Sequence, residues 1–285
     1  MLRKHTPELM VLAAAALWGT SGPVTQLAAL PAGVISFFRM AIPTVVIGGV
    51  FAVRRHRLSR KGLGLRLTAS ALNAIRMLFF FLAYQYTTVA NAVVTLYTWP
   101  IFAAIFARIV LGERVSRERV LLLGLAFTGI PLLYLNAVGS NSRGSDDVIG
   151  ISSMLVSAAF HALAIVLLKR AKPGGSRLES TFFQNIVGAA VFLPVVLVLR
   201  PELTVVQLSL VVYLGLVVGT LGFTLFFIGL HGASTARMSN LAYFEVVVAI
   251  ILSVVVLQQP IYWNTVVGGI LIIVSVLVAQ GRRVG

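Results

Sequence analysis

Few side chains that could do chemistry lie within the apolar stretches of this sequence. Asn73, Arg76, Phe80 and Tyr84 follow i, i+3, i+7 and i+11 spacing, which places them on one face of a helix. An arginine at the centre of a bilayer costs about 2.5–3.5 kcal/mol to insert, so it normally faces other helices or a wet cavity. Arg76 is therefore expected either to bind a carboxylate or to pair with a backbone carbonyl or with Glu245 for assembly.

Glu245 and His161 are the other ionisable candidates. Glu245 is the only carboxylate predicted to lie deep inside an apolar stretch, where it would carry a proton, hold a substrate ammonium or form a structural ion pair. His161 closes a polar stripe with Ser153 and Ser157 at i, i+4 and i+8. Such a stripe either lines a cavity or packs closely against a neighbouring helix, and histidine titrates near neutral pH.

Several aromatic residues lie inside the apolar stretches, away from the interfacial belt where Trp and Tyr usually collect. They include Trp18, Tyr84, Tyr97, Trp99 and Tyr243. Such rings could hold an apolar or aromatic side chain by stacking, or an ammonium by cation–π contact. The alternative is that they are ordinary core or lipid-facing residues.

The elements that must position these residues are transmembrane helices. Of the 285 residues, 59% are hydrophobic and only 11% are charged, whereas a soluble domain has about a quarter charged residues. About 20 apolar residues span a hydrocarbon core, and only helices satisfy their backbone there in a chain of this pattern. We expect ten such helices, over residues 8–29, 32–53, 63–86, 88–111, 118–136, 148–169, 178–199, 204–229, 234–258 and 262–280.

Basic residues distribute unequally between the two sides of these helices. Counting each helix edge with its adjoining loop, 18 of the 23 Lys and Arg residues fall on the side that holds both termini, two fall on the other side, and Arg39, Arg76 and Arg108 lie within helices. Because cytoplasmic loops carry the excess of Lys and Arg, we expect both termini in the cytoplasm. The net charge of +15 is then explained by the basic cytoplasmic loops that set the orientation, and these loops would also attract anionic lipid. Nucleic acid is not an expected partner.

The two halves of the chain are weakly similar. Tyr97 and Ala103 match Tyr243 and Ala249 at an offset of 146, and Ser36-Phe37-Phe38 aligns with Thr181-Phe182-Phe183 at an offset of 145. We therefore predict two five-helix repeats, residues 1–140 and 141–285. An odd number of helices in each repeat makes the two repeats inverted, and inverted repeats place a substrate site near the midplane.

This organisation resembles the drug/metabolite transporter superfamily, EamA type. The first half carries Trp99-Pro100, an apolar run and then Gly112-Glu113, while the second helix carries Phe37-Phe38-Arg39. The second half departs from the family pattern, with Gln258-Gln259 in place of Gly-Glu. The resemblance implies structural roles for Arg39 and Glu245, and Tyr97-Thr98-Trp99-Pro100 is similar to the aromatic signature of YddG-type amino-acid exporters.

The expected function is secondary transport rather than catalysis, because the sequence has no nucleotide-binding loop, HExxH motif or GxSxG elbow. We predict a bacterial inner-membrane exporter of amino acids, aromatic or neutral, or of related metabolites, acting as a monomer in the bilayer without cofactor or metal. The alternatives are an exporter of cationic, amphipathic drugs and a membrane enzyme or lipid-handling protein. The predicted substrate site comprises Trp18, Arg76, Phe80, Tyr84, Tyr97, Trp99, Ser157, His161, Tyr243 and Glu245.

Overall fold

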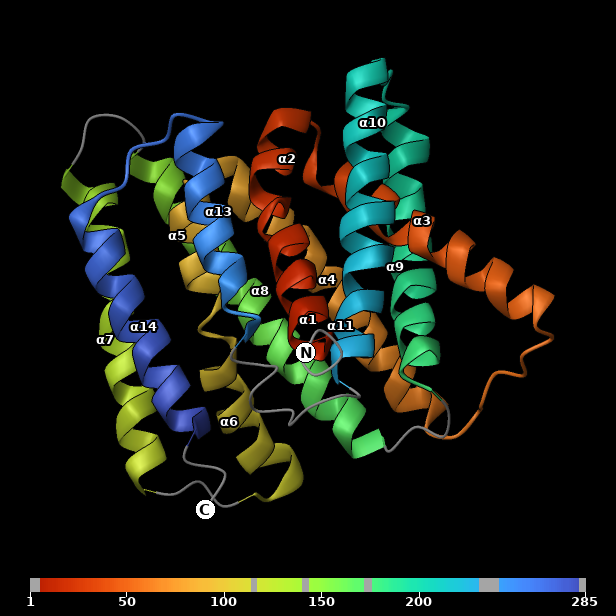
Figure 1. Cartoon of the computed structure of the whole chain (residues 1–285), viewed down its shortest axis with the longest axis horizontal. Coiled ribbons are helices and arrows are strands. Elements are labelled where there is room, and N and C mark those ends of the chain that lie inside the picture. Colours follow the sequence, from red (N-terminus) through yellow and green to blue (C-terminus); the bar gives the residue numbers. More distant parts are fainter. Residues whose placement is uncertain (1–5, 114–116, 140–143, 172–175, 231–240, 282–285) are drawn as a thin grey trace.

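The protein is an all-helical bundle in the described part of the chain (Figure 1). The computed structural model describes residues 6–113, 117–139, 144–171, 176–230 and 241–281. The helices of the first half are α1 (Thr6–Gly19), α2 (Ser21–Ala28), α3 (Ala32–Val53), α4 (Leu63–Tyr86), α5 (Val89–Leu96), α6 (Trp99–Leu111) and α7 (Arg117–Gly139). Those of the second half are α8 (Gly144–Ala171), α9 (Arg177–Leu199), α10 (Val205–Tyr213), η2 (Leu214–Leu221), α11 (Gly222–Leu230), α13 (Phe244–Val255) and α14 (Trp263–Gly281).

The bounds of most of these helices agree with the predicted bounds to within a few residues. By length and composition, six segments of the described residues could cross a membrane, namely Ala32–Val53, Leu63–Tyr86, Val89–Leu111, Asp146–Ala171, Arg177–Leu199 and Val205–Gly229. Shorter apolar helices lie at Gly124–Leu135, Phe244–Val255 and Trp263–Ser275. A polytopic all-α membrane protein is thereby confirmed. The predicted start of the ninth helix and the predicted boundary at 140/141 lie outside the described residues.

Some passes expected to be continuous helices are interrupted near their middle. The first pass breaks between α1 and α2, where the Thr20 hydroxyl donates to the Leu17 carbonyl at 2.6 Å. The fourth pass breaks at Tyr97–Thr98. Pro100 occupies the first turn of α6, where its missing N–H costs nothing. The eighth pass contains the π-helical segment η2.

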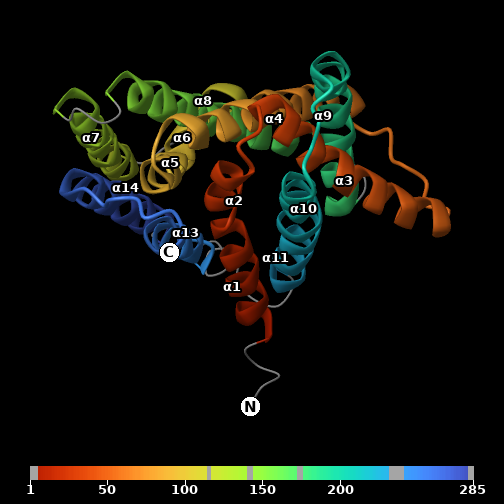
Figure 2. The same ribbon diagram turned by 90° about the horizontal axis from the view of Figure 1, so that it is seen from above.

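The two halves are interleaved rather than separate. The most extensive contacts join α4 with α8, α14 with α7, α3 with α9 and α1 with α11, and in both views α7 and α14 lie together on one side while α3, α9 and α10 lie on the other (Figures 1 and 2). At the crossing of α7 and α14 two glycines face each other. A Cβ on Gly129 would lie 2.7 Å from the Gly268 carbonyl oxygen, and one on Gly268 would lie 2.8 Å from that of Gly129.

The ends of α6 and α13 show the inverted repeat in backbone detail. Gly112 ends α6 with φ 68°, and Gln258, 146 residues later, has φ 53°. Next to each, an N–H closes the same kind of bond, from Glu113 to the Ala107 carbonyl at 3.3 Å and from Gln259 to the Ser253 carbonyl at 3.1 Å. The departure of Gln258-Gln259 from Gly-Glu therefore leaves the backbone turn unchanged.

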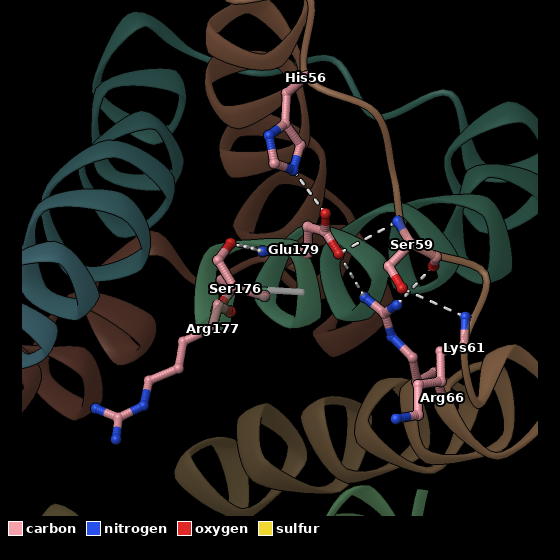
Figure 3. A network of polar contacts seen from close by, with 8 residues as sticks. His56, Ser59, Lys61, Arg66, Ser176, Arg177 and Glu179 are labelled. Atoms are coloured by element: carbon pink, nitrogen blue, oxygen red, sulfur yellow. Dashed lines mark hydrogen bonds and ion pairs between the residues drawn. The ribbon is translucent and has the colours of Figure 1, made fainter. Parts of the chain in front are cut away.

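A buried ionic cluster connects the two halves at the end of the bundle where α1 begins and α3 ends, which we call the basic end (Figure 3). Glu179, at the start of α9, lies 2.6 Å from His56 Nε2 and accepts a hydrogen bond from the Ser59 N–H at 3.4 Å. Arg66 Nη2 lies 3.6 Å from the same carboxylate, and its guanidinium carbon lies 4.3 Å from the Phe183 ring centroid. Since both charged side chains are about 1% exposed, the loop between α3 and α4 is anchored to α9.

Candidate functional site

The broken fourth pass meets the start of α13 through a pair of tyrosines. Tyr97 ends α5 and Tyr243 precedes α13, and their ring centroids lie 4.5 Å apart. The Tyr97 hydroxyl lies 2.9 Å from Glu245 Oε2 and 3.0 Å from the Ala242 carbonyl oxygen, so its hydrogen is shared between two acceptors. Because a helix break exposes backbone groups at membrane depth only where protein or a cavity covers them, this junction is a candidate binding position.

Arg76 on α4 is the centre of a second cluster of candidate site residues. Its Nε donates to Asn73 Oδ1 at 3.1 Å, and its Nη2 lies 3.0 Å from the Met77 sulfur. The guanidinium carbon lies 5.5 Å from the Phe80 ring centroid, and Phe80 in turn packs edge-on against Tyr84 at 5.0 Å. The predicted helical face is therefore a continuous cation–aromatic stack.

Arg76 and Glu245 do not form a contact ion pair. Among the described residues, the ion pairs within 4.0 Å are His56–Glu179, Arg66–Glu179 and Lys169–Glu113. The charges of Arg76 and Glu245 are nonetheless close enough to attract each other. The assembly pair that the sequence left open is thus not made at contact distance.

The polar stripe of α8 borders Arg76. Ser157 is fully buried and donates to the Arg76 carbonyl at 3.0 Å, so its hydroxyl holds the α4 backbone. His161 packs edge-on against Trp99 at 5.3 Å and lies within range of the Arg76 charge. Figure 2 shows α4 and α8 running side by side, which explains how this stripe reaches the Arg76 group.

Trp18 belongs to a different aromatic cluster. Its ring lies 5.0 Å from Phe223 and 5.1 Å from Phe226 of α11. Its Nε1 is buried and has no hydrogen-bond partner within the described ranges. Trp18 therefore lies at the last turn of α1, and no ring contact joins it to the tyrosine pair in this part of the chain.

Two glycines that no sequence pattern indicated bring the first pass against the site. A Cβ on Gly22 would lie 2.6 Å from Tyr84 Cε1, and one on Gly19 would lie 2.8 Å from the Glu245 carbonyl oxygen. Any larger residue would push α1 and α2 away from Tyr84 and α13. Neither glycine has a positive φ, so only the tertiary contact reveals their role.

A cavity of about 450 Å³ opens beside Tyr84, at the end of the bundle opposite the basic end. Its lining consists of Thr25, Gln26, Ala29, Leu30, Tyr84 and Gln85. Tyr84 belongs both to this lining and to the Arg76 stack, so one residue of that stack borders the cavity. The described residues contain no group of three or more His, Asp or Glu side chains that could hold a metal.

Comparison with known proteins identifies relatives of the whole fold. The EamA-like transporter family matches residues 5–135 and again residues 148–280. A solved crystal structure superposes with a TM-score of 0.65 over 97% of this chain and 99% of the other, at 20% identity, which shows the fold alone.

Relatives by sequence include several bacterial transporters. The pseudopaline exporter CntI of Pseudomonas aeruginosa is 29% identical over 59% of this chain, and the match spans only 57% of that protein. An uncharacterized transporter of Clostridium kluyveri is 24% identical over 79% of this chain and 75% of its own length. The uncharacterized transporter YvbV of Bacillus subtilis is 23% identical over 99% of this chain and 93% of its own length.

Proposed function

This chain belongs to the EamA-like transporter family, and on that premise we propose that it exports an amino acid or a related amino-carboxylate metabolite by alternating access. The observation that carries the proposal is the separation of Arg76 and Glu245. Two opposite charges lie close in the centre of the bundle without pairing at contact distance. An amino acid carries the complementary carboxylate and ammonium, so it would bridge them.

Each site group then has a role in binding. The Arg76 guanidinium would hold the carboxylate, with Asn73 fixing its orientation through Nε. Glu245 would take the ammonium, with the Tyr97 hydroxyl holding its Oε2. The side chain of the substrate would lie against ring surfaces supplied by Phe80, Tyr84, Trp99 and Tyr243. These rings favour the aromatic or neutral substrates that the resemblance implies.

Alternating access requires that the site open to one side at a time. The cavity beside Tyr84 opens at the end opposite the basic end, and the buried Glu179 cluster links the two halves at the basic end. If the basic residues mark the cytoplasmic side, this arrangement is an outward-open state. The breaks at Thr20 and Tyr97–Thr98 would then supply the points about which helix segments pivot.

Export of a cationic, amphipathic drug is a second candidate, favoured by the close, tilted Tyr97–Tyr243 ring pair beside Glu245. Aromatic faces and a carboxylate together suit a cation. In that case Glu245 would dominate binding, and Arg76 would be dispensable for transport.

Counterflow of labelled amino acids in liposomes containing the purified protein tests the proposal. We expect saturable uptake that falls by about tenfold or more in both Arg76→Gln and Glu245→Gln, because a lost charged hydrogen bond is worth roughly 1.5–3 kcal/mol. Arg108→Gln, an exposed arginine of α6, is the matched control and should transport normally. Loss of cation export in Glu245→Gln but not in Arg76→Gln, without amino-acid flux, would favour the drug exporter.

A further inference from the structure

We infer that Arg39 is a second anion-binding residue of this site and that the substrate is an amino acid with an additional acidic group. This inference rests on the proposed function. It keeps the amino and carboxylate groups of the substrate and replaces the aromatic or neutral side chain that the resemblance implied with an acidic one. It also reverses the structural role that the resemblance implied for Arg39.

Arg39 is a buried cation that has no counter-ion among the described residues. The residue is only 8% exposed, in the middle of α3. Among the described residues, its one recorded favourable contact is with the Phe223 ring, whose centroid lies 5.7 Å from its guanidinium carbon. No hydrogen bond and no ion pair within 4.0 Å satisfies its five donors in that part of the chain. Burying an unpaired charge is costly, so an anion that binds there is strongly favoured.

Arg66 shows how this same chain buries an arginine for structure alone. Arg66 is 1% exposed, faces the Glu179 carboxylate at 3.6 Å and donates to the Ser59 carbonyl at 2.9 Å. It also lies over the Phe183 ring at 4.3 Å. Arg39 has the aromatic contact but neither the carboxylate nor the carbonyl, which is the arrangement expected when the anion arrives from outside.

The backbone around Arg39 leaves space for its guanidinium. A Cβ on Gly219 would lie 2.5 Å from Arg39 Nη1 and 3.0 Å from Cζ, so a larger residue at this position of η2 would displace the guanidinium. The π-helical segment η2 extends over Leu214–Leu221, and single π-helical turns within helices occur frequently at functional sites. Phe223, which Arg39 faces, also contacts Trp18, so the predicted site residue Trp18 lies one ring away from Arg39.

A neutral amino acid would not pair all three charged groups of the candidate site, Arg39, Arg76 and Glu245. Arg39 and Arg76 are close enough for their charges to repel each other, while Glu245 is the one carboxylate recorded as acting on Arg76. A neutral amino acid would pair its carboxylate with Arg76 and its ammonium with Glu245, and would leave Arg39 unpaired. A second carboxylate on the substrate would complete the pairing, and its affinity would be raised by the two neighbouring cations.

The test compares an isosteric pair, L-glutamate and L-glutamine, which differ in charge at one end. Counterflow of each is measured at concentrations below saturation in liposomes containing the full chain, with L-phenylalanine as a third substrate. We expect wild-type protein to favour glutamate over glutamine by about 10- to 100-fold, the value of one charged hydrogen-bonded contact. Arg39→Gln should reduce that ratio to near one, and Arg39→Lys should retain part of it.

The control variant is Arg108→Gln, which should leave the glutamate-to-glutamine ratio at its wild-type value. Size-exclusion profiles and thermal unfolding of each variant in detergent separate a binding defect from misfolding. If Arg39→Gln does not fold, protection of wild-type and Arg39→Lys protein against heating by glutamate, but not by glutamine, replaces the flux ratio as the measurement.

The possible outcomes separate the inference about Arg39 from the proposed transport of amino acids. Equal or greater flux of glutamine, or a ratio unaltered in Arg39→Gln, would overturn the inference and leave amino-acid transport standing. Flux of neutral amino acids that requires chloride, compared with methanesulfonate, would assign the Arg39 anion to chloride and also overturn it. Absence of flux for all three amino acids would overturn the proposed function together with the inference.

Discussion

Tyr97 is the single residue that connects most of the candidate site. It ends α5 in the first half, packs against the ring of Tyr243 in the second half and hydrogen-bonds to Glu245. The sequence selected Tyr97 and Tyr243 through their offset of 146, and the structure brings them together. It could not select Gly19 or Gly22, because a glycine that permits a close approach carries no pattern of its own.

Removing the Tyr97 hydroxyl should weaken transport without unfolding the protein. In Tyr97→Phe the ring contact with Tyr243 is kept, but Glu245 Oε2 loses a hydrogen-bond donor. We therefore expect amino-acid counterflow to fall about tenfold. Tyr86→Phe, at the end of α4 and partly exposed, is the matched control and should transport normally. Wild-type rates in Tyr97→Phe would show that the hydroxyl does not position Glu245.

At the scale of elements, the backbone adopts the left-handed region at the end of α6 and at the corresponding position after α13. Gly112 has φ 68°, and nothing lies within 4 Å of the position its Cβ would take. Its counterpart Gln258 adopts the same left-handed region at φ 53° with a side chain. The sequence indicated the turn in the first half through Gly-Glu, but in the second half only the backbone reveals it.

Gly112→Ala is expected to destabilise the protein by about 1 kcal/mol, because a Cβ is disfavoured in the left-handed region. Gly64→Ala is the matched control. Gly64 also has nothing within 4 Å, but it lies inside α4 without a positive φ, so the alanine should be neutral or stabilising by about 0.5–1 kcal/mol. Thermal unfolding in detergent measures both, and equal effects of the two substitutions would contradict the backbone argument.

The ionic cluster at the basic end should be a major contributor to stability. Glu179→Ala leaves the buried Arg66 without its carboxylate, and breaking a buried pair in this way costs about 3–5 kcal/mol. We expect a large drop in unfolding temperature. Glu202→Ala, an exposed carboxylate between α9 and α10, is the control and should unfold like wild type. A small effect of Glu179→Ala would mean that water reaches Arg66.

At the scale of the whole molecule, packing between the halves sets how the bundle can move. Helices of the first half contact mainly helices of the second, so the halves cannot move as two separate domains. The repeat pattern predicted symmetry, and the family match confirms the two-repeat fold. The interleaving could not be predicted, because apolar helices in lipid carry little sequence signal for which neighbour they choose.

Substrate should change access to the cavity beside Tyr84. The chain has no cysteine, so a single introduced cysteine reports alone. We expect Gln85→Cys, an exposed lining position, to react with a membrane-impermeant maleimide several-fold more slowly when saturating substrate shifts the population toward a closed state. Val205→Cys, 82% exposed at the start of α10, should be labelled equally in both conditions. Unchanged labelling of Gln85→Cys would argue against closure at this end.

The sequence by itself determined the helices, the family and the short inventory of buried charges and rings. It could do so because apolar length, basic loops and helical spacing are local properties of the chain. The tertiary structure decided which of those residues meet. Only the fold separates Arg76 from Glu245, places Trp18 against α11, and gives Arg66 a carboxylate while leaving Arg39 without one in the described part of the chain. Pairing between distant helices depends on close packing in three dimensions, which no spacing in one dimension records.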